Sequence, residues 1–179
     1  KKLTPATFLV ELGKASCEGS VLCGYAVAAD VAACKAKVDA DAAAAATKAT
    51  PYDLATAVKS GNLIFDAARA KTCVESSRTP PSCTDSYFQN GTDCAGVFVA
   101  AVEVGGACKS DLECKSGQCL GATNDGCAGT CKAPVANGGS CDNSADRCAD
   151  TALCNIPDGA EVGTCDPFKA AAGEVCESD

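Results

Sequence analysis

The first part of the chain carries apolar residues at helical spacing. It opens on Thr4-Pro5, where threonine can accept hydrogen bonds from unpaired amides and proline at the first helical position loses none. Phe8, Leu12 and Ala15 then lie on one helical face. The pattern predicts an amphipathic helix that ends near Gly19.

A second, longer helix is predicted from Val21 to Ala49. Its apolar stripe turns two cysteines to the same side as three valines: Cys23, Val27, Val31, Cys34 and Val38. The run from Ala42 to Ala46 has high helix propensity but little side-chain volume. We expect that run either to approach another helix closely or to form an exposed arm.

Two shorter helices are predicted after this one. Thr50-Pro51 repeats the cap and proline, Asp53 stands where a capping box favours an acid, and Ser60-Gly61 ends the helix. Asp66 can cap the next helix, which ends before Thr79-Pro80-Pro81 and turns three residues inward: Ala70, Cys73 and Val74.

The segment from Cys94 to Val104 fits a short helix or a strand, because its apolar run is too brief for a period to decide. Asn90-Gly91 before it predicts a turn. We interpret residues 1–104 as a small α-helical N-terminal domain, rich in alanine. It holds six cysteines whose pairing the sequence leaves open: Cys17, Cys23, Cys34, Cys73, Cys83 and Cys94.

The hydrophobic pattern changes at Gly105. The 75 residues from there onward contain only eight large apolar side chains but ten of the 16 cysteines. So few apolar residues cannot bury enough surface to offset the chain entropy, so cross-links must hold this part together. We therefore predict a disulfide-rich segment formed by loops and β-hairpins, with little regular secondary structure, over residues 105–179.

The cysteine-rich part repeats at a period of about 33 residues. Three segments open alike: Gly105-Gly106-Ala107-Cys108, Gly138-Gly139-Ser140-Cys141 and Gly173-Glu174-Val175-Cys176. The first two close on Gly-Thr-Cys, at Cys131 and Cys165. We interpret 105–137 and 138–172 as repeats and 173 as the start of a third. That start predicts either that the native chain continues or that Cys176 ties down the C-terminus.

The first repeat carries the pattern G-G-x-C-x-S-D-x-x-C-x-x-G-x-C, from Gly105 to Cys119. In this it resembles the cysteine-rich secreted and lipoprotein-type proteins of myxobacteria, whose repeats are similar to the N-terminal cysteine-rich region of Dickkopf. The alanine-rich upstream part, with Phe65-Asp66 leading to Cys73, also resembles that family. The resemblance implies a bacterial protein that is secreted or surface-anchored, without assigned chemistry.

A related colipase-like architecture implies the disulfide pairs in the tail. By that analogy we expect four pairs: Cys108–Cys119, Cys114–Cys131, Cys141–Cys154 and Cys148–Cys165. Cys127 departs from the four-cysteine pattern. It bonds either Cys176 or a cysteine of the helical domain.

The composition argues against catalysis and metal binding. The chain has no histidine, which removes the commonest general base and most zinc sites, and it has no Cys-x2-Cys pair for zinc or redox chemistry. Asp142, Ser144 and Asp146 alternate as in a calcium loop, but Arg147 stands where an EF-hand needs glycine. A solvated acidic turn is the alternative there. We predict no enzyme activity, no cofactor, no metal and no small-molecule substrate.

Charge and cysteine content bear on the partners and the compartment. The formal charge is −8, and 12 acidic but only 5 basic residues lie in the tail, which argues against nucleic acid as a partner. No apolar run is long enough to cross a membrane. Because disulfides persist in oxidising compartments, we predict an extracellular or outer cell-surface location.

We predict a secreted or cell-surface, non-enzymatic structural or interaction protein, in which the repeats serve as a stalk or an interaction module. Self-association into an extracellular assembly or filament would suit stapled repeats. The alternative is a binding or inhibitory module that acts on another secreted protein through Asn124-Asp125-Gly126 and Asp158-Gly159-Ala160. An enzyme ranks third.

Overall fold

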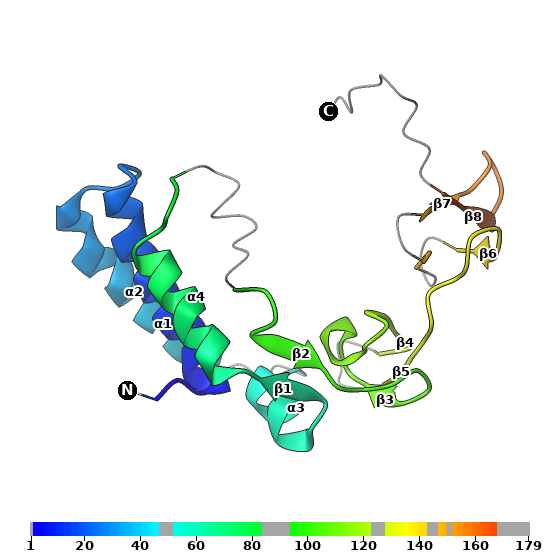
Figure 1. Ribbon diagram of the computed structural model, residues 1–179, viewed down its shortest axis with the longest axis horizontal. Coiled ribbons are helices and arrows are strands. Elements are labelled where there is room, and N and C mark those ends of the chain that lie inside the picture. The colour runs from blue at the N-terminus through cyan, green and yellow to red at the C-terminus, as the bar shows by residue number, and fades with distance from the viewer. Residues whose placement is uncertain are drawn as a thin grey trace.

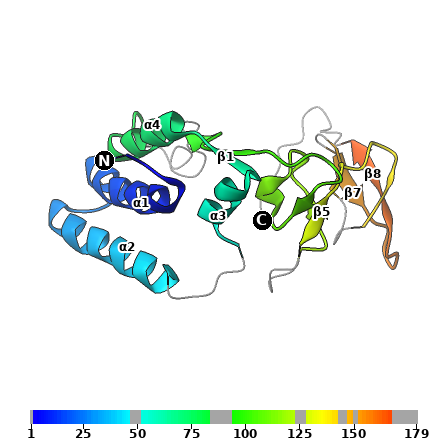
Figure 2. The same cartoon turned by 90° about the horizontal axis from the view of Figure 1, so that it is seen from below.

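The computed structural model describes residues 2–46, 52–83, 94–122, 128–142, 147–149 and 152–167. Helices gather at one end of an elongated molecule, and two small β modules follow them along the chain (Figures 1 and 2). The predicted fold class, a helical N-terminal region followed by disulfide-rich hairpins, is confirmed. Among the described residues, no helix combines the length and the apolar character that a bilayer crossing requires.

Helix α1 spans Pro5–Leu22 and begins as predicted. Thr4 caps it, and Thr4 and Thr7 form a reciprocal capping box. The predicted end at Gly19 is wrong, because the helix continues for almost another turn. Gly19 instead marks a close approach: a Cβ there would lie 2.1 Å from the carbonyl oxygen of Ser77.

Helix α2 spans Val31–Ala46, so a single helix from Val21 to Ala49 is wrong at its beginning. Gly24 adopts a φ of +73°, and a short 3-10 turn, η1 (Ala28–Asp30), separates α1 from α2. None of the α2 residues is buried. Cys23 and Cys34 therefore belong to different elements and do not share an apolar stripe.

Helix α3 spans Leu54–Ser60 and is capped by Asp53, which accepts hydrogen bonds from the amides of Ala55 and Thr56. The predicted start at Thr50-Pro51 is too early: it places Asp53 inside the first turn, whereas Asp53 is the N-cap and the helix begins at Leu54. Residues 50 and 51 themselves lie outside the described residues. Gly61, with a φ of +82°, ends the helix as predicted.

Helix α4 spans Ala67–Arg78, is capped by Asp66 and buries Ala70, Cys73 and Val74, all as predicted. Strand β1 (Leu63–Phe65) pairs antiparallel with β2 (Phe98–Ala100), so the ambiguous segment after Cys94 contains a strand. The turn predicted at Asn90-Gly91 lies outside the described residues.

The core of the helical domain lies between α1, α4 and the β1–β2 sheet. Its centre is the ring of Phe8, which lies 6.1 Å from the ring of Phe65 and 5.8 Å from that of Phe98. The other buried members are small or aliphatic: Ala15, Ala70, Cys73, Val74 and Val97. Helix α2 packs on α1 outside this core (Figure 2).

An ion cluster ties the three long helices together. Glu18 of α1 accepts hydrogen bonds from Lys35 of α2 and, at 2.6 Å, from Nε of Arg78 of α4. The Lys35 ammonium holds the pKa of the Glu18 carboxyl below its ordinary value, although partial burial opposes the shift. The fold therefore favours the ionised form of the Glu18 carboxyl.

The two β modules have the same topology. Module 1 contains β3 (Ala107–Cys108), a 3-10 turn η3 (Asp111–Glu113), β4 (Cys119–Leu120) and β5 (Gly129–Cys131), with the strand order β3-β5-β4. Module 2 contains β6 (Ser140–Cys141), β7 (Ala152–Asn155) and β8 (Gly163–Pro167), in the order β6-β8-β7. The named strands of both modules pair antiparallel, and the described part of the tail contains no α-helix.

Candidate functional site

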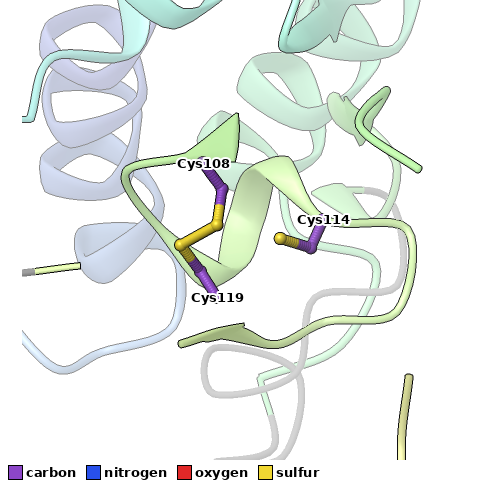
Figure 3. Close-up of side chains that lie close together, drawn as sticks. All are labelled: Cys108, Cys114 and Cys119. Atoms are coloured by element: carbon purple, nitrogen blue, oxygen red, sulfur yellow. A yellow bond between two sulfur atoms is a disulfide. The ribbon is translucent and has the colours of Figure 1, made fainter. Parts of the chain in front are cut away.

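Two disulfides cross in each β module, and these cystine pairs are the main chemical feature of the tail. The four pairs are the same as those the colipase-like analogy implies: Cys108–Cys119, Cys114–Cys131, Cys141–Cys154 and Cys148–Cys165. Figure 3 shows the first pair, with the Cys114 sulfur beside it. Cys127 and Cys176 lie outside the described residues.

Cystine sulfur takes the place of a conventional core in both modules. The buried cluster of module 1 consists of Cys108, Cys114 and Cys131, and that of module 2 consists of the corresponding cysteines: Cys141, Cys148 and Cys165. Val102 packs against the first cluster and Val135 against the second. The expectation that cross-links substitute for apolar mass agrees with these clusters.

The two valines reveal a part of the repeat that sequence reasoning missed. The amide of Val102 donates to the carbonyl of Glu113 at 2.9 Å, and that of Val135 donates to the carbonyl of Arg147 at 2.8 Å. Each valine also forms a bridge with the second cysteine of its module. Both stand three residues before Gly-Gly, a coincidence of spacing that could have revealed them. The packing of each module thus begins at its valine.

Close approach explains the glycines of the repeat motif. A Cβ at Gly106 would lie 2.6 Å from Cγ1 of Val102, and a Cβ at Gly139 would lie 2.6 Å from Cγ1 of Val135. The glycine of the closing Gly-Thr-Cys is also crowded, since a Cβ at Gly163 would lie 2.2 Å from the carbonyl oxygen of Asn155. The motif therefore encodes module packing.

The six cysteines of the helical domain bond among themselves. Their pairs are Cys17–Cys34, Cys23–Cys83 and Cys73–Cys94. The first joins α1 to α2, and the third lies at the core. A bond from Cys127 into this domain is therefore wrong, because no partner is left there. A bond between Cys127 and Cys176 stays a prediction.

Three sulfurs in each module lie within 4.8 Å of one another, a spacing that would suit a metal ion. They belong to Cys108, Cys114 and Cys119 in module 1, and to Cys141, Cys148 and Cys165 in module 2. A zinc or iron–sulfur site needs thiolates, however, and each of these sulfurs is already bonded to another sulfur. With the cysteines oxidised, each cluster consists of disulfide cross-links. Of the three oxygen-bearing residues in the calcium-like pattern, Asp142 lies within the described residues, and Ser144 and Asp146 lie outside them.

A groove of about 720 Å³ lies between α1, the end of α2 and the start of α3. Its walls are mainly alanine and aliphatic side chains, and its two carboxylates are already engaged. Asp41 pairs with Lys37, and hydrogen bonds from Thr56 hold the pKa of Asp53 below its ordinary value. The absence of enzyme activity stays a prediction.

One of the two loops predicted to be presented to a partner lies within the described residues. Asp158-Gly159-Ala160 forms an exposed turn between β7 and β8, closed by a hydrogen bond from the amide of Ala160 to the carbonyl of Pro157 at 2.9 Å. The other loop, 124–126, lies outside them.

No protein-family model, no curated protein and no solved structure matches this chain. The resemblance to the myxobacterial cysteine-rich proteins therefore stays a prediction.

Proposed function

We propose that the protein is a secreted or cell-surface structural protein without enzyme activity, whose stapled modules form a stalk that extends from a helical head. In this proposal the protein contacts other proteins, including further copies of itself in an extracellular assembly. The observation that carries the proposal is the set of seven disulfides within the described residues, four of which repeat the same crossed pattern in successive modules.

The physical properties of such modules suit an extracellular stalk. Disulfides persist outside the cytosol, and cross-links that constrain the unfolded chain oppose local opening and proteolysis. The modules follow the helical domain along the molecule and do not pack around it (Figure 1). The abundance of acidic groups gives the tail a strongly hydrated surface.

Size-exclusion chromatography with light scattering tests whether the oxidised protein assembles. We expect the weight-average mass to rise with protein concentration and to fall again on dilution. A constant mass near that of one 17.7 kDa chain over the whole concentration range would contradict the assembly role.

The exposed β7–β8 turn supports a second function, that of a binding or inhibitory module for another secreted protein. Small stapled scaffolds often present such a turn to a partner. Under this alternative, the protein stays monomeric and captures one partner at fixed stoichiometry. Replacing Asp158 and Glu161 with alanine should then abolish capture, while the double replacement of Glu103 and Asp166, which lie outside the turn, should preserve it.

A further inference from the structure

One position of the repeat faces the preceding unit of the chain in both modules. It is the residue directly before the second cysteine: Glu113 in module 1 and Arg147 in module 2. Their backbones are equivalent, because each carbonyl accepts the hydrogen bond from the valine that begins the module. Their side chains differ in charge, burial and partner.

Glu113 joins module 1 to the helical domain through a buried contact. Its side chain is only 1% exposed, and its Oε2 accepts hydrogen bonds from Nδ2 of Asn62 at 3.1 Å and from the amide of Lys109 at 2.7 Å. Asn62 belongs to the turn between α3 and β1, whereas Lys109 belongs to module 1. One carboxylate thus bridges the two units.

Two further features lie at this first joint. The hydroxyl of Tyr52, just before α3, is buried beside module 1; burial raises its pKa, and the charge of Glu113 raises it further. The chain also passes into module 1 without a linker. Ala101, directly after β2, donates its amide to the carbonyl of Asn62 at 3.0 Å, and Val102 already belongs to the module.

Arg147 joins module 2 to module 1 through an exposed contact. Its Nη2 lies 3.6 Å from Oδ2 of Asp111, and the two side chains are 61% and 53% exposed. Its guanidinium also passes close to Gly117, where a Cβ would lie 3.4 Å from Nη1. A solvated ion pair at this distance is weak and is screened by salt.

We propose that the residue before the second cysteine docks each module on the unit before it, and that the two joints differ in stiffness. Glu113 fixes module 1 to the helical domain as one rigid body, whereas Arg147 holds module 2 through a soft, salt-sensitive joint. The inference deepens the stalk role proposed above by giving the stalk a rigid base and a bending tip. Its test concerns the joints alone, so it can fail while the stalk role stands.

Nitrogen-15 NMR relaxation on the oxidised full chain measures the rotational correlation time of each unit separately. We expect the helical domain and module 1 to share one correlation time and module 2 to have a shorter one. Raising NaCl to about 0.5 M should shorten the value for module 2 alone, because screening is then strong. Independent tumbling of module 1 in the unmodified protein would overturn the proposal.

Variants locate the effect at the named residues. Glu113→Ala should lower the correlation time of module 1 below that of the helical domain. The control Glu103→Ala should leave it unchanged, because it removes the same charge from a side chain near module 1 that is 74% exposed. Arg147→Ala should act on module 2 as salt does. Equal correlation times of the helical domain and module 1 in Glu113→Ala would contradict the docking role.

A second variant covers the case in which Glu113→Ala disturbs module 1 itself. Asn62→Ala removes the partner from the helical side and leaves every residue of module 1 in place. It should also separate the correlation times, with the four tail disulfides intact by peptide mapping. If Asn62→Ala keeps one shared correlation time, Glu113 is not the contact that fixes the joint.

Discussion

Two disulfides of equal loop length should have very different importance for folding. Cys17–Cys34 in the helical domain and Cys148–Cys165 in module 2 both join cysteines 17 residues apart. Each therefore constrains the unfolded chain by a similar amount, about 3 kcal/mol in the chain-entropy treatment. The consequence of losing it depends on what else holds the unit together.

Apart from its disulfides, module 2 has few contacts that stabilise its fold. Its buried cluster consists of three cysteines, with Val135 and Ala152 packed against them, whereas the helical domain retains the core around Phe8. A core in a unit this small rarely supplies more than about 3 to 5 kcal/mol. Replacing Cys148 and Cys165 with alanine should therefore unfold module 2. Replacing Cys17 and Cys34 should lower the melting temperature but leave α1 and α4 folded.

Hydrogen exchange followed by mass spectrometry distinguishes the two outcomes by region. In the module 2 variant, amides of β7 and β8 should exchange at the rate of an unfolded chain, while those of α1, α4 and module 1 keep their protection. In the helical variant, α1 and α4 should remain protected, and α2 alone should lose protection because none of its residues is buried. Protected β7 and β8 amides in the module 2 variant would refute the reasoning that sulfur replaces the core.

Two further predictions concern the helical domain. Gly19→Ala should destabilise it by about 1 to 3 kcal/mol, seen as a lower melting temperature, because the new Cβ would lie 2.1 Å from the Ser77 carbonyl oxygen. The control Gly13→Ala should lower the melting temperature less, because its Cβ meets only a valine methyl at 3.1 Å. Equal melting temperatures of the two variants would contradict the close approach at Gly19. Because Lys35 holds the Glu18 pKa below its ordinary value of 4.5, Glu18 contributes stability above that pH and loses it as the pH falls through the folded pKa. Glu18→Gln should therefore flatten the decline of melting temperature below about pH 4.5, and an unchanged decline would show that the cluster does not stabilise the fold.

Local chemistry was enough to predict the elements whose boundaries one residue decides. Thr4 and Asp66 cap their helices, and Gly61 ends one with a left-handed backbone. These residues act within one turn of chain, so the sequence around them carries the information. The same holds for the repeat, whose period revealed two modules with one topology.

Contacts between distant segments could not be predicted in this way. Gly19 suggested a helix end, but its role depends on Ser77 of a helix far along the chain. The i, i+4 spacing of Cys23 and Val27 suggested a continuous helix, although Gly24 turns the chain between them. The pairing of the six cysteines in the helical domain also depends on how the helices pack. The sequence therefore left the identity of those three disulfides undecided.

The joint residues were missed for a related reason. Glu113 and Arg147 occupy one repeat position with opposite charges, so comparison of the copies shows no shared residue there. A glutamate in an acidic, cysteine-rich segment is ordinarily solvated, and the hydrogen bond from Asn62, a residue far away in the sequence, could not be foreseen. The signal becomes visible once the valine that begins each module is recognised.

Peptide mapping of the oxidised protein without reduction tests the central claim most directly. The claim is that both modules fold around the same crossed pair of cystines in place of an apolar core. We predict peptides that link the first to the third cysteine and the second to the last in each module: Cys108–Cys119, Cys114–Cys131, Cys141–Cys154 and Cys148–Cys165. Sequential pairs such as Cys108–Cys114, or thiols at these positions that react with N-ethylmaleimide, would contradict the account.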